Sequence, residues 1–264
     1  MINLLRKELK IHYMKTITIS NQKGGVGKTT TVLCLSAGLA ELGYKVLSVD
    51  LEGQRNLTAT LGNVRSNKPT ILEVLAEESD IREAIQTNQT GDFISGSKAL
   101  SLIDTVLTGE NKYTALRDAL EVISDEYDYC IIDTPPALGT LTLNALTASD
   151  AVIIPVDWDL YSAWGLNDLI ETIASVKKNY NKGLQVLGVL LTKYDTRTKL
   201  SSEMTDYLQQ ITSAFGTSLF DTRIRHSVKV KEIQLKPQGL YKYAPRAIVT
   251  QDYRNFVNEV LERL

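Results

Sequence analysis

The sequence has no long hydrophobic run, few cysteines and no low-complexity linker, and each absence excludes a class of protein. No apolar stretch approaches the ~18 residues of a membrane-spanning helix, and the N-terminus lacks the apolar core of a secretory signal. Cys34 and Cys130 lie far apart inside apolar runs, so we expect buried thiols in a reducing cytosol. No Pro/Gly/Ser-rich linker and no internal repeat interrupts the 264 residues, which predicts one domain.

The sequence does contain an alternation of apolar and amphipathic runs. Continuous apolar runs are typical of strands buried on both faces of a parallel sheet, and Gly43 marks the end of the first helix. We therefore predict an α/β fold, a doubly wound and mostly parallel sheet flanked by helices. The expected strands are 15–20, 45–50, 129–133, 151–156 and 186–192, and the expected helices are 30–42, 113–123, 166–180, 200–214 and 251–264.

The chain divides into a short extension and a single domain. Met14 begins the run "MKTITIS", which is a natural start for the first strand. We expect residues 1–13 to be an N-terminal extension and residues 14–264 to be the folded domain. Thirteen residues are too few for a helix-turn-helix DNA reader, and the sequence contains no zinc finger.

A glycine-rich loop, "SNQKGGVGKTT" (Ser20 to Thr30), connects the first expected strand to the first helix. Glycines let a backbone turn its N–H groups toward phosphate oxygens, and the following helix adds its positive end. Lys28 is placed to reach the β- and γ-phosphates, and the Thr29 hydroxyl can ligate Mg²⁺. The loop thus predicts a P-loop NTPase, but it contains a second lysine, Lys23. That lysine could serve its own site or a nucleotide held by a facing subunit.

The motif Lys-Gly-Gly-x-Gly-Lys-Thr resembles the deviant Walker A loop of the ParA/MinD ATPases, and the whole stretch resembles the ParA/Soj partition branch. "VDLEGQRNLT", "YDYCIIDTPPALGTLTLNAL", "SDAVIIPV" and "LLTKYDTRTKLS" match later motifs of the family in order. The resemblance implies an ATPase with ATP and Mg²⁺, in which Lys23 crosses an ATP-sandwich homodimer to the partner's nucleotide. The loop residues expected to bind nucleotide are Lys23, Gly24, Gly25, Val26, Gly27, Lys28, Thr29 and Thr30.

Acidic residues end two of the expected strands. Asp133 closes an apolar strand and is placed, with Thr29, to hold Mg²⁺ directly or through water. Asp50 and Glu52 follow the second strand, and the resemblance gives Glu52 the role of positioning the attacking water. Glu52 stands where the family has Asp, Gly53 where proline is usual, and Arg55 where a small residue is usual. We expect slow, partner-stimulated hydrolysis, with Lys23, Lys28, Asp50 and Glu52 as the catalytic residues.

The run Thr192-Lys193-Tyr194-Asp195 looks like the element by which GTPases read guanine, whereas ParA-type chains bind adenine. By resemblance we predict ATP, with Thr192 and Arg225 contacting the nucleotide; competition between ATP and GTP tests this prediction.

Positive charge gathers near the C-terminus. Residues 222–246 carry seven Lys/Arg and one acid, which gives +6, so the rest of a chain with net charge −2 carries −8. Such a stretch suggests a polyanionic partner. In the ParA/Soj branch, basic residues on one face of the dimer bind DNA without sequence preference, which involves phosphate contacts. The residues predicted to bind DNA are Arg197, Lys229, Lys231 and Lys236.

The resemblance also implies a ParB-like centromere-binding adaptor and a cytoplasmic, nucleoid-associated location. One alternative is a MinD-like membrane ATPase, but "QDYRNFVNEVLERL" mixes both signs of charge and reads as a packing helix. A nitrogenase-type iron protein needs cysteines on interface loops, and a bacterial tyrosine kinase carries a tyrosine-rich tail; neither pattern is present. The remaining alternative is a scaffold ATPase that positions another cargo without binding DNA.

Overall fold

The computed structural model describes residues 13–264, except residues 63, 66, 158–159, 195–199 and 237. All but the last residue of the expected N-terminal extension lies outside this part, so the proposed boundary stays a prediction. Within the described part, no helix is long and apolar enough to cross a bilayer.

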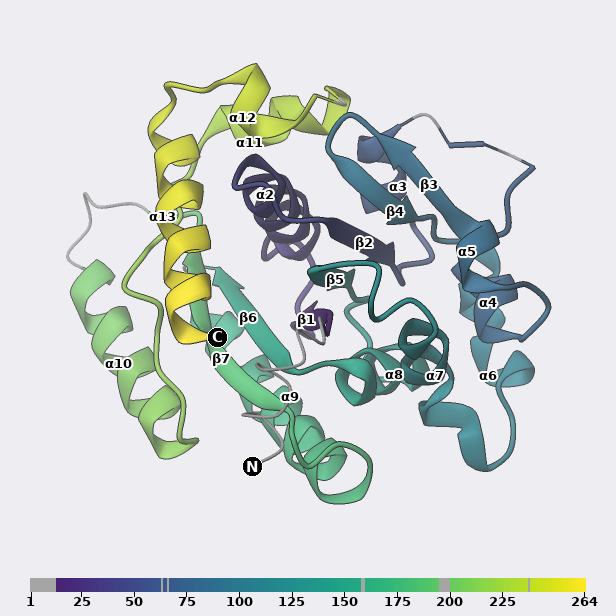
Figure 1. Ribbon diagram of the computed structural model, residues 1–264. Helices are drawn as coiled ribbons and strands as arrows, with labels where there is room; N and C mark the ends of the chain where they lie inside the picture. Colours follow the sequence, from purple (N-terminus) through teal and green to yellow (C-terminus); the bar gives the residue numbers. More distant parts are fainter. Residues whose placement is uncertain (1–12, 63, 66, 158–159, 195–199, 237) are drawn as a thin grey trace, which may run out of the picture.

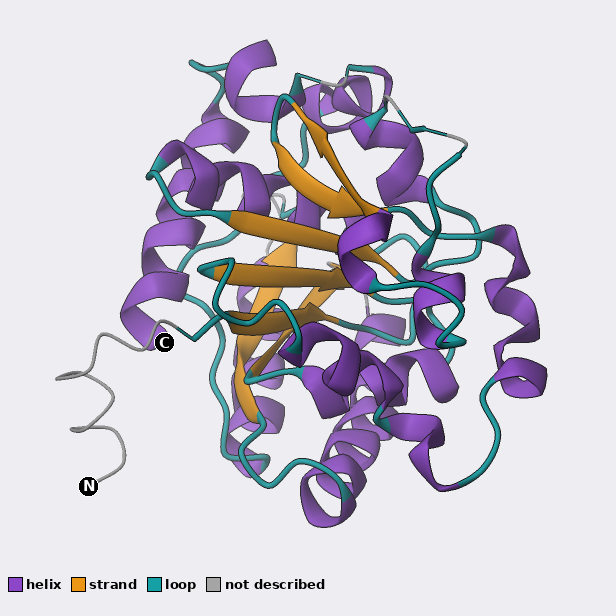
Figure 2. Ribbon diagram, turned by 45° about the vertical axis from the view of Figure 1, so that its right-hand side comes forward, coloured by secondary structure: helices purple, strands orange, loops and turns teal. Residues whose placement is uncertain are grey.

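A seven-stranded sheet with helices on both faces forms the centre of the molecule (Figures 1 and 2). The strand order is β3-β4-β2-β5-β1-β6-β7, and every pair is parallel except the edge hairpin β3–β4. This confirms the doubly wound, mostly parallel fold. The strands are β1 (Lys15–Ile19), β2 (Val46–Asp50), β3 (Ile85–Asn88), β4 (Gly91–Ile94), β5 (Tyr129–Asp133), β6 (Ala151–Asp157) and β7 (Gln185–Thr192).

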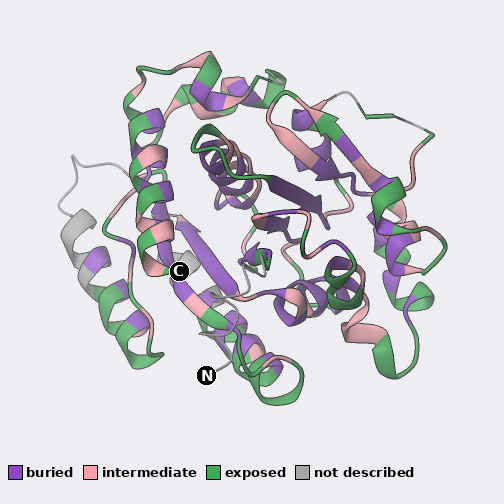
Figure 3. Cartoon of the chain, in the orientation of Figure 1, coloured by how far each residue is buried: buried purple, intermediate pink, exposed green. Residues whose placement is uncertain are grey.

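Sequence reasoning missed the β3–β4 hairpin, because its strands, "IQTN" and "GDFI", are short and contain no continuous apolar run. The five longer strands fall where the apolar runs predict them. Their side chains are buried along almost their whole length (Figure 3), as expected for strands covered on both faces.

The helices form two layers. Helices α2, α12 and α13 pack together on one face, and α7, α8 and α9 cover the other (Figure 1). The first helix ends as predicted, because Gly43 takes a left-handed φ of 91°. The helices are α2 (Lys28–Glu41), α3 (Asn56–Leu61), α4 (Ile71–Leu75), α5 (Ile81–Ala84), α6 (Ile103–Val106), α7 (Ala115–Glu121), α8 (Thr140–Ala148), α9 (Leu160–Asn179), α10 (Leu200–Ala214), α11 (Val228–Glu232), α12 (Gly239–Tyr243) and α13 (Ile248–Arg263); the 3₁₀ helices are η1 (Lys98–Leu102), η2 (Glu110–Tyr113) and η3 (Ile233–Leu235).

The register of the central strands decides where the site lies. Ile19 of β1 pairs with Asp133 of β5, and Asp50 of β2 pairs with the same Asp133. The glycine-rich loop follows Ile19 by a few residues. The ends of three neighbouring strands therefore bring the loop and both carboxylates to the carboxyl edge of the sheet, where ligands bind in open α/β folds.

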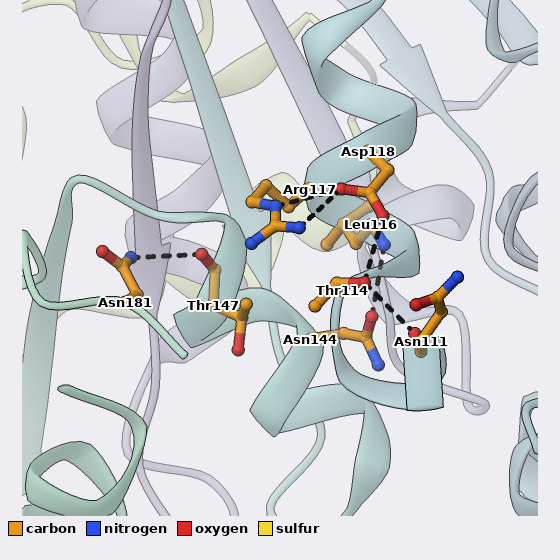
Figure 4. A network of polar contacts seen from close by, with 8 residues as sticks. All are labelled: Asn111, Thr114, Leu116, Arg117, Asp118, Asn144, Thr147 and Asn181. Carbon is orange, nitrogen blue, oxygen red and sulfur yellow. Dashed lines mark hydrogen bonds and ion pairs between the residues drawn. The ribbon is translucent and has the colours of Figure 1, made fainter. Parts of the chain in front are cut away.

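Polar contacts fix α8, the helix that follows the Asp133 loop. The buried Asn144 side chain accepts a hydrogen bond from the Leu116 backbone N–H at 3.2 Å and donates to the Lys112 carbonyl at 2.8 Å. Asn181 donates to the carbonyl of Thr147 at 3.1 Å, near the C-terminal end of α8 (Figure 4). Side-chain hydrogen bonds therefore hold the middle and the C-terminal end of α8.

Candidate nucleotide-binding site

The glycine-rich loop has the backbone that its sequence predicts. Gly25 and Gly27 have left-handed φ values of 77° and 92°, which residues with a Cβ rarely adopt. No atom lies within 4 Å of a Cβ built on Gly24 or Gly25, so that side of the loop is open. Gly27 is the N-cap of α2, whose first turn contains no acidic residue. The loop thus presents its backbone N–H groups and a helix N-terminus to an anion, with no acidic side chain in the first turn of α2 to repel it.

Backbone carbonyls of the loop hold the Lys28 ammonium in place. Its ammonium donates to the Asn21 carbonyl at 2.9 Å and to the Lys23 carbonyl at 3.1 Å, and the residue is buried. Burial lowers the pKa of Lys28, while Asp133 and Glu52 oppose that shift. A bound phosphate would stabilise the charged form of Lys28, which burial disfavours.

The second lysine, Lys23, lies at the start of the loop. Its backbone N–H donates to the Asn21 side-chain oxygen at 2.9 Å, and the Asn21 amide donates to the Pro155 carbonyl of β6 at 2.7 Å. Asn21 therefore ties the loop to the neighbouring strand. The structure contains one chain, so the role of Lys23 across a dimer stays a prediction.

Asp133 is completely buried at the end of β5. Neither of its carboxylate oxygens has a hydrogen-bond partner among the described residues. The Thr29 hydroxyl is close enough to polarise the carboxylate without the geometry of an ordinary hydrogen bond. Burial first, then the nearby charge of Asp50, raises the pKa of Asp133 well above its ordinary value. A divalent cation would supply the missing partner, so the residues fit the predicted Mg²⁺ site.

Asp50 has a different environment, although it is equally buried. One of its oxygens accepts from the Glu52 N–H at 3.0 Å, and the other accepts from the N–H and hydroxyl of Thr58 at 2.8 and 2.5 Å. Thr58 in turn accepts from the Gly96 N–H at 2.9 Å. Burial raises the pKa of Asp50, and the Thr58 hydroxyl opposes the rise. These contacts fix the Asp50 carboxylate against the backbone of Glu52 and Thr58; the prediction that Asp50 is catalytic stays a prediction.

Glu52 is half-buried at the wall of the cleft. Its carboxylate accepts a hydrogen bond from the Asn56 amide at 3.3 Å. Burial raises the pKa of Glu52, whereas the Asn56 contact and the charge of Lys28 oppose the rise. Arg55 takes a left-handed φ of 60° at the N-cap of α3, and its Nε is buried with no hydrogen-bond partner among the described residues. The segment that departs most from the family pattern is thus also locally strained.

The loop and Glu52 share one cleft of about 430 Å³. Sequence reasoning missed part of its lining, above all Ile233 and Gln234, which no sequence motif connects to a loop two hundred residues earlier. The lining residues are Gly24, Gly25, Gly27, Lys28, Thr29, Thr30, Leu33, Glu52, Gln54, Asn56, Ala59, Thr60, Pro136, Ile233 and Gln234.

The two residues expected to contact the nucleotide from later in the chain are not among the lining residues of this cleft. The Thr192 hydroxyl is buried and lies 2.8 Å from the Val26 carbonyl, so it supports the loop from behind. Arg225 forms an ion pair with Asp252 of α13, and its Nε lies 2.9 Å from that carboxylate. Asp195, on which a guanine-reading role depends, lies outside the described residues.

The predicted basic surface is partly neutralised by its own neighbours. Lys229 donates to the carboxylate of Glu232 at 2.8 Å. Lys231 and Lys236 are exposed on the same segment. Arg197, the fourth residue predicted to bind DNA, lies outside the described residues.

The fold and the phosphate loop at its carboxyl edge define the class of P-loop ATPases, and residues 14–186 match the family described as an AAA domain. The sporulation initiation inhibitor protein Soj of Bacillus subtilis is 37% identical over 93% of this chain and 98% of its own length. The chromosome partitioning protein ParA of Caulobacter vibrioides is 36% identical over 95% of each chain. The chain belongs to the Soj/ParA family of P-loop ATPases.

A solved structure shares the fold closely. Cobyrinic acid a,c-diamide synthase from Mycobacterium smegmatis, crystallised with an ATP analogue and magnesium, is 30% identical with a TM-score of 0.83, over 94% of both chains. The family resemblance predicted from the sequence is therefore confirmed.

Proposed function

We propose that this protein is an ATPase of DNA partition that dimerises with ATP, binds DNA without sequence preference in that state and is released by hydrolysis. The observation that carries the nucleotide part is the Asp133 carboxylate, buried without a hydrogen-bond partner among the described residues, beside a P-loop that contains two lysines. The partition part is supported by the relatives named for chromosome partitioning.

The chain's own residues have distinct roles in this proposal. The N–H groups of the loop bind the phosphates, and Lys28 exchanges its two carbonyl acceptors for phosphate oxygens. Thr29 and Asp133 would hold Mg²⁺, which neutralises charge on the phosphate oxygens. Glu52 orients the attacking water, and Asp50 fixes the backbone on which Glu52 lies. The strained Arg55 turn supports the expectation of slow hydrolysis, because water positioning tolerates little displacement.

Lys23 is proposed to act across the dimer. Lys28 already occupies the position of the P-loop lysine, so a second cation in the same loop is explained by a nucleotide held in the facing subunit. Dimerisation would also double the number of basic side chains on one face, and linked contacts gain affinity through effective concentration.

The partners of the dimer are proposed to be DNA and a ParB-like adaptor that stimulates hydrolysis. Exposed Lys231 and Lys236, together with Lys229 and Arg197, would contact phosphates. Such contacts carry no sequence information, so the adaptor would supply the specificity. The expected location is the cytoplasmic nucleoid.

Sedimentation velocity with MgATP, MgADP or no nucleotide, combined with fluorescence anisotropy on two unrelated duplexes, tests the proposal. We expect a dimer with MgATP alone and equal affinity for both duplexes in that state. Absence of an ATP-dependent dimer would overturn the proposal. A dimer that ignores DNA at low salt would favour the scaffold ATPase instead.

A further inference from the structure

Residues 227–236 form a segment that lines the nucleotide cleft on its inner side and carries exposed lysines on its outer side. On the inner side, Ile233 is 1% exposed and lines the nucleotide cleft together with Gln234. On the outer side, Lys229, Lys231 and Lys236 are exposed. The same ten residues thus belong to the cleft and to the predicted DNA surface.

Glu232 lies between these two sides, and its carboxylate contacts Lys229 on the outer side. Its Oε2 accepts from the Lys229 ammonium at 2.8 Å and from the Tyr243 hydroxyl at 2.9 Å. The same ammonium lies 5.5 Å from the centre of the Tyr243 ring. The hydrogen bond with Lys229, followed by that with Tyr243, lowers the pKa of Glu232, which is therefore a carboxylate at neutral pH. It neutralises Lys229 and joins α11 to α12.

This ion pair is weak enough to be exchanged. The Lys229 and Glu232 side chains are 47% and 36% exposed, and ion pairs this exposed contribute little to stability because water screens them. DNA phosphates can therefore compete with Glu232 for Lys229, and a movement of the segment would shift that competition.

A route for such a movement lies in the chain itself. Glu232 is the last residue of α11 and directly precedes Ile233, the first residue of η3. A nucleotide that touches Ile233 or Gln234 therefore acts on the backbone next to the carboxylate. Helix η3 also packs against α3, which follows Glu52 and Arg55. Both walls of the cleft are thus connected to Glu232.

We propose that Glu232 is an autoinhibitory latch, which holds Lys229 away from DNA until occupancy of the cleft shifts Ile233 and Gln234. This inference rests on the proposed function, and it adds a route of control within one subunit, separate from the doubling of contacts by dimerisation.

Glu232→Gln tests the latch, because glutamine removes the charge and still accepts a hydrogen bond from Tyr243. The matched control is Glu121→Gln, which removes the same charge from an exposed position on α7, on the other face of the sheet (Figure 1). Duplex affinity is measured for each full-length protein without nucleotide and with MgATP. We expect Glu232→Gln to raise affinity without nucleotide about fivefold and to reduce the ratio between the two states by a similar factor. Glu121→Gln should leave the ratio unchanged.

Two further measurements separate the latch from a simple change of charge. In a Lys229→Gln background, Glu232→Gln should produce no gain in affinity, because the Lys229 ammonium that the substitution would free is absent. In hydrogen exchange on the wild-type protein at concentrations that keep it monomeric, MgADP should slow the amides of residues 230–236 as well as those of the glycine-rich loop.

The outcomes are distinct. An unchanged ratio for Glu232→Gln, or a gain that persists in the Lys229→Gln background, overturns the latch while the partition function stands. Protection of the loop without protection of residues 230–236 does the same. If the wild-type protein does not bind nucleotide or DNA, the proposed function itself fails.

Discussion

The floor of the cleft and the basic segment, residues 222–246, differ in how their charged groups are held. The floor comprises three buried charged groups: Lys28, the first residue of α2, lines the cleft, and Asp50 and Asp133 end β2 and β5. All three are less than 10% exposed, and backbone hydrogen bonds fix Lys28 and Asp50. The basic segment contains the short helices α11, η3 and α12, and its Lys229–Glu232 ion pair is exposed. Chemistry that needs exact positions lies where packing fixes them, whereas contacts that need only charge lie where side chains can exchange partners.

The largest effect is expected on the floor, for Lys28→Ala. The variant should bind MgATP at least about 100-fold more weakly, which corresponds to about 2.7 kcal/mol, because a buried cation in contact with the loop is lost. Calorimetric titration measures this affinity. Lys15→Ala, an exposed lysine on the neighbouring strand, serves as the control. Unchanged affinity in Lys28→Ala would contradict the assignment of the loop.

Asp133→Asn tests the metal site through stability. The pKa of Asp133 is raised in the folded state, so ionisation costs stability: the nucleotide-free wild type should lose stability as the pH rises from about 4 through the raised pKa. The variant should melt at a higher temperature than the wild type at pH 7, and Mg²⁺ with ADP should stabilise the wild type more than the variant.

Thermal melts at several pH values, with and without Mg²⁺, check this prediction. Asp168→Asn, at an exposed position on α9, is the control. Equal melting temperatures of wild type and Asp133→Asn at pH 7 would show that the buried carboxylate carries no such cost.

Lys23→Ala separates the two lysines of the loop. We expect MgATP affinity to stay within about threefold of the wild type, while the ATP-dependent dimer is lost over the accessible concentration range. Sedimentation velocity at several protein concentrations is the measurement. A dimer of normal affinity would show that Lys23 is not needed to contact a nucleotide in the facing subunit.

A smaller effect is expected on the basic segment, for Lys229→Glu. Affinity for duplex DNA should fall several-fold for all sequences alike, and the slope of log affinity against log salt should decrease by about 0.9 for each lost phosphate contact. Anisotropy titrations between low and physiological salt measure both. Lys178→Glu, on α9 of the opposite face, controls for net charge. Sequence-dependent losses would argue against a backbone-only contact.

The smallest effect is expected at Arg55, the N-cap of α3. Glycine accepts the left-handed φ of 60° without strain, so Arg55→Gly should stabilise the protein by about 1 kcal/mol or less, reduced by the entropy that glycine gains on unfolding. Glu77→Gly, at a second left-handed position with φ 59°, is the matched comparison. Denaturant unfolding gives both values. A change in ATP hydrolysis confined to Arg55→Gly would show that the strained turn tunes Glu52.

The sequence alone determined the fold class, the loop with its two lysines and the identity of the strand-end acids, because these depend on local patterns: apolar runs, glycines at left-handed positions and a lysine next to a threonine. It did not predict the polar β3–β4 hairpin, which relies on the sheet for its place. Only the tertiary structure decided that Asp133 has no hydrogen-bond partner in the described part of the chain while both oxygens of Asp50 are bonded, since both acids look alike in sequence. It also brought Ile233 and Gln234 to the loop and Tyr243 to Glu232. Those relations depend on which side chains meet across the sheet and its helices, and no spacing along one chain encodes such meetings.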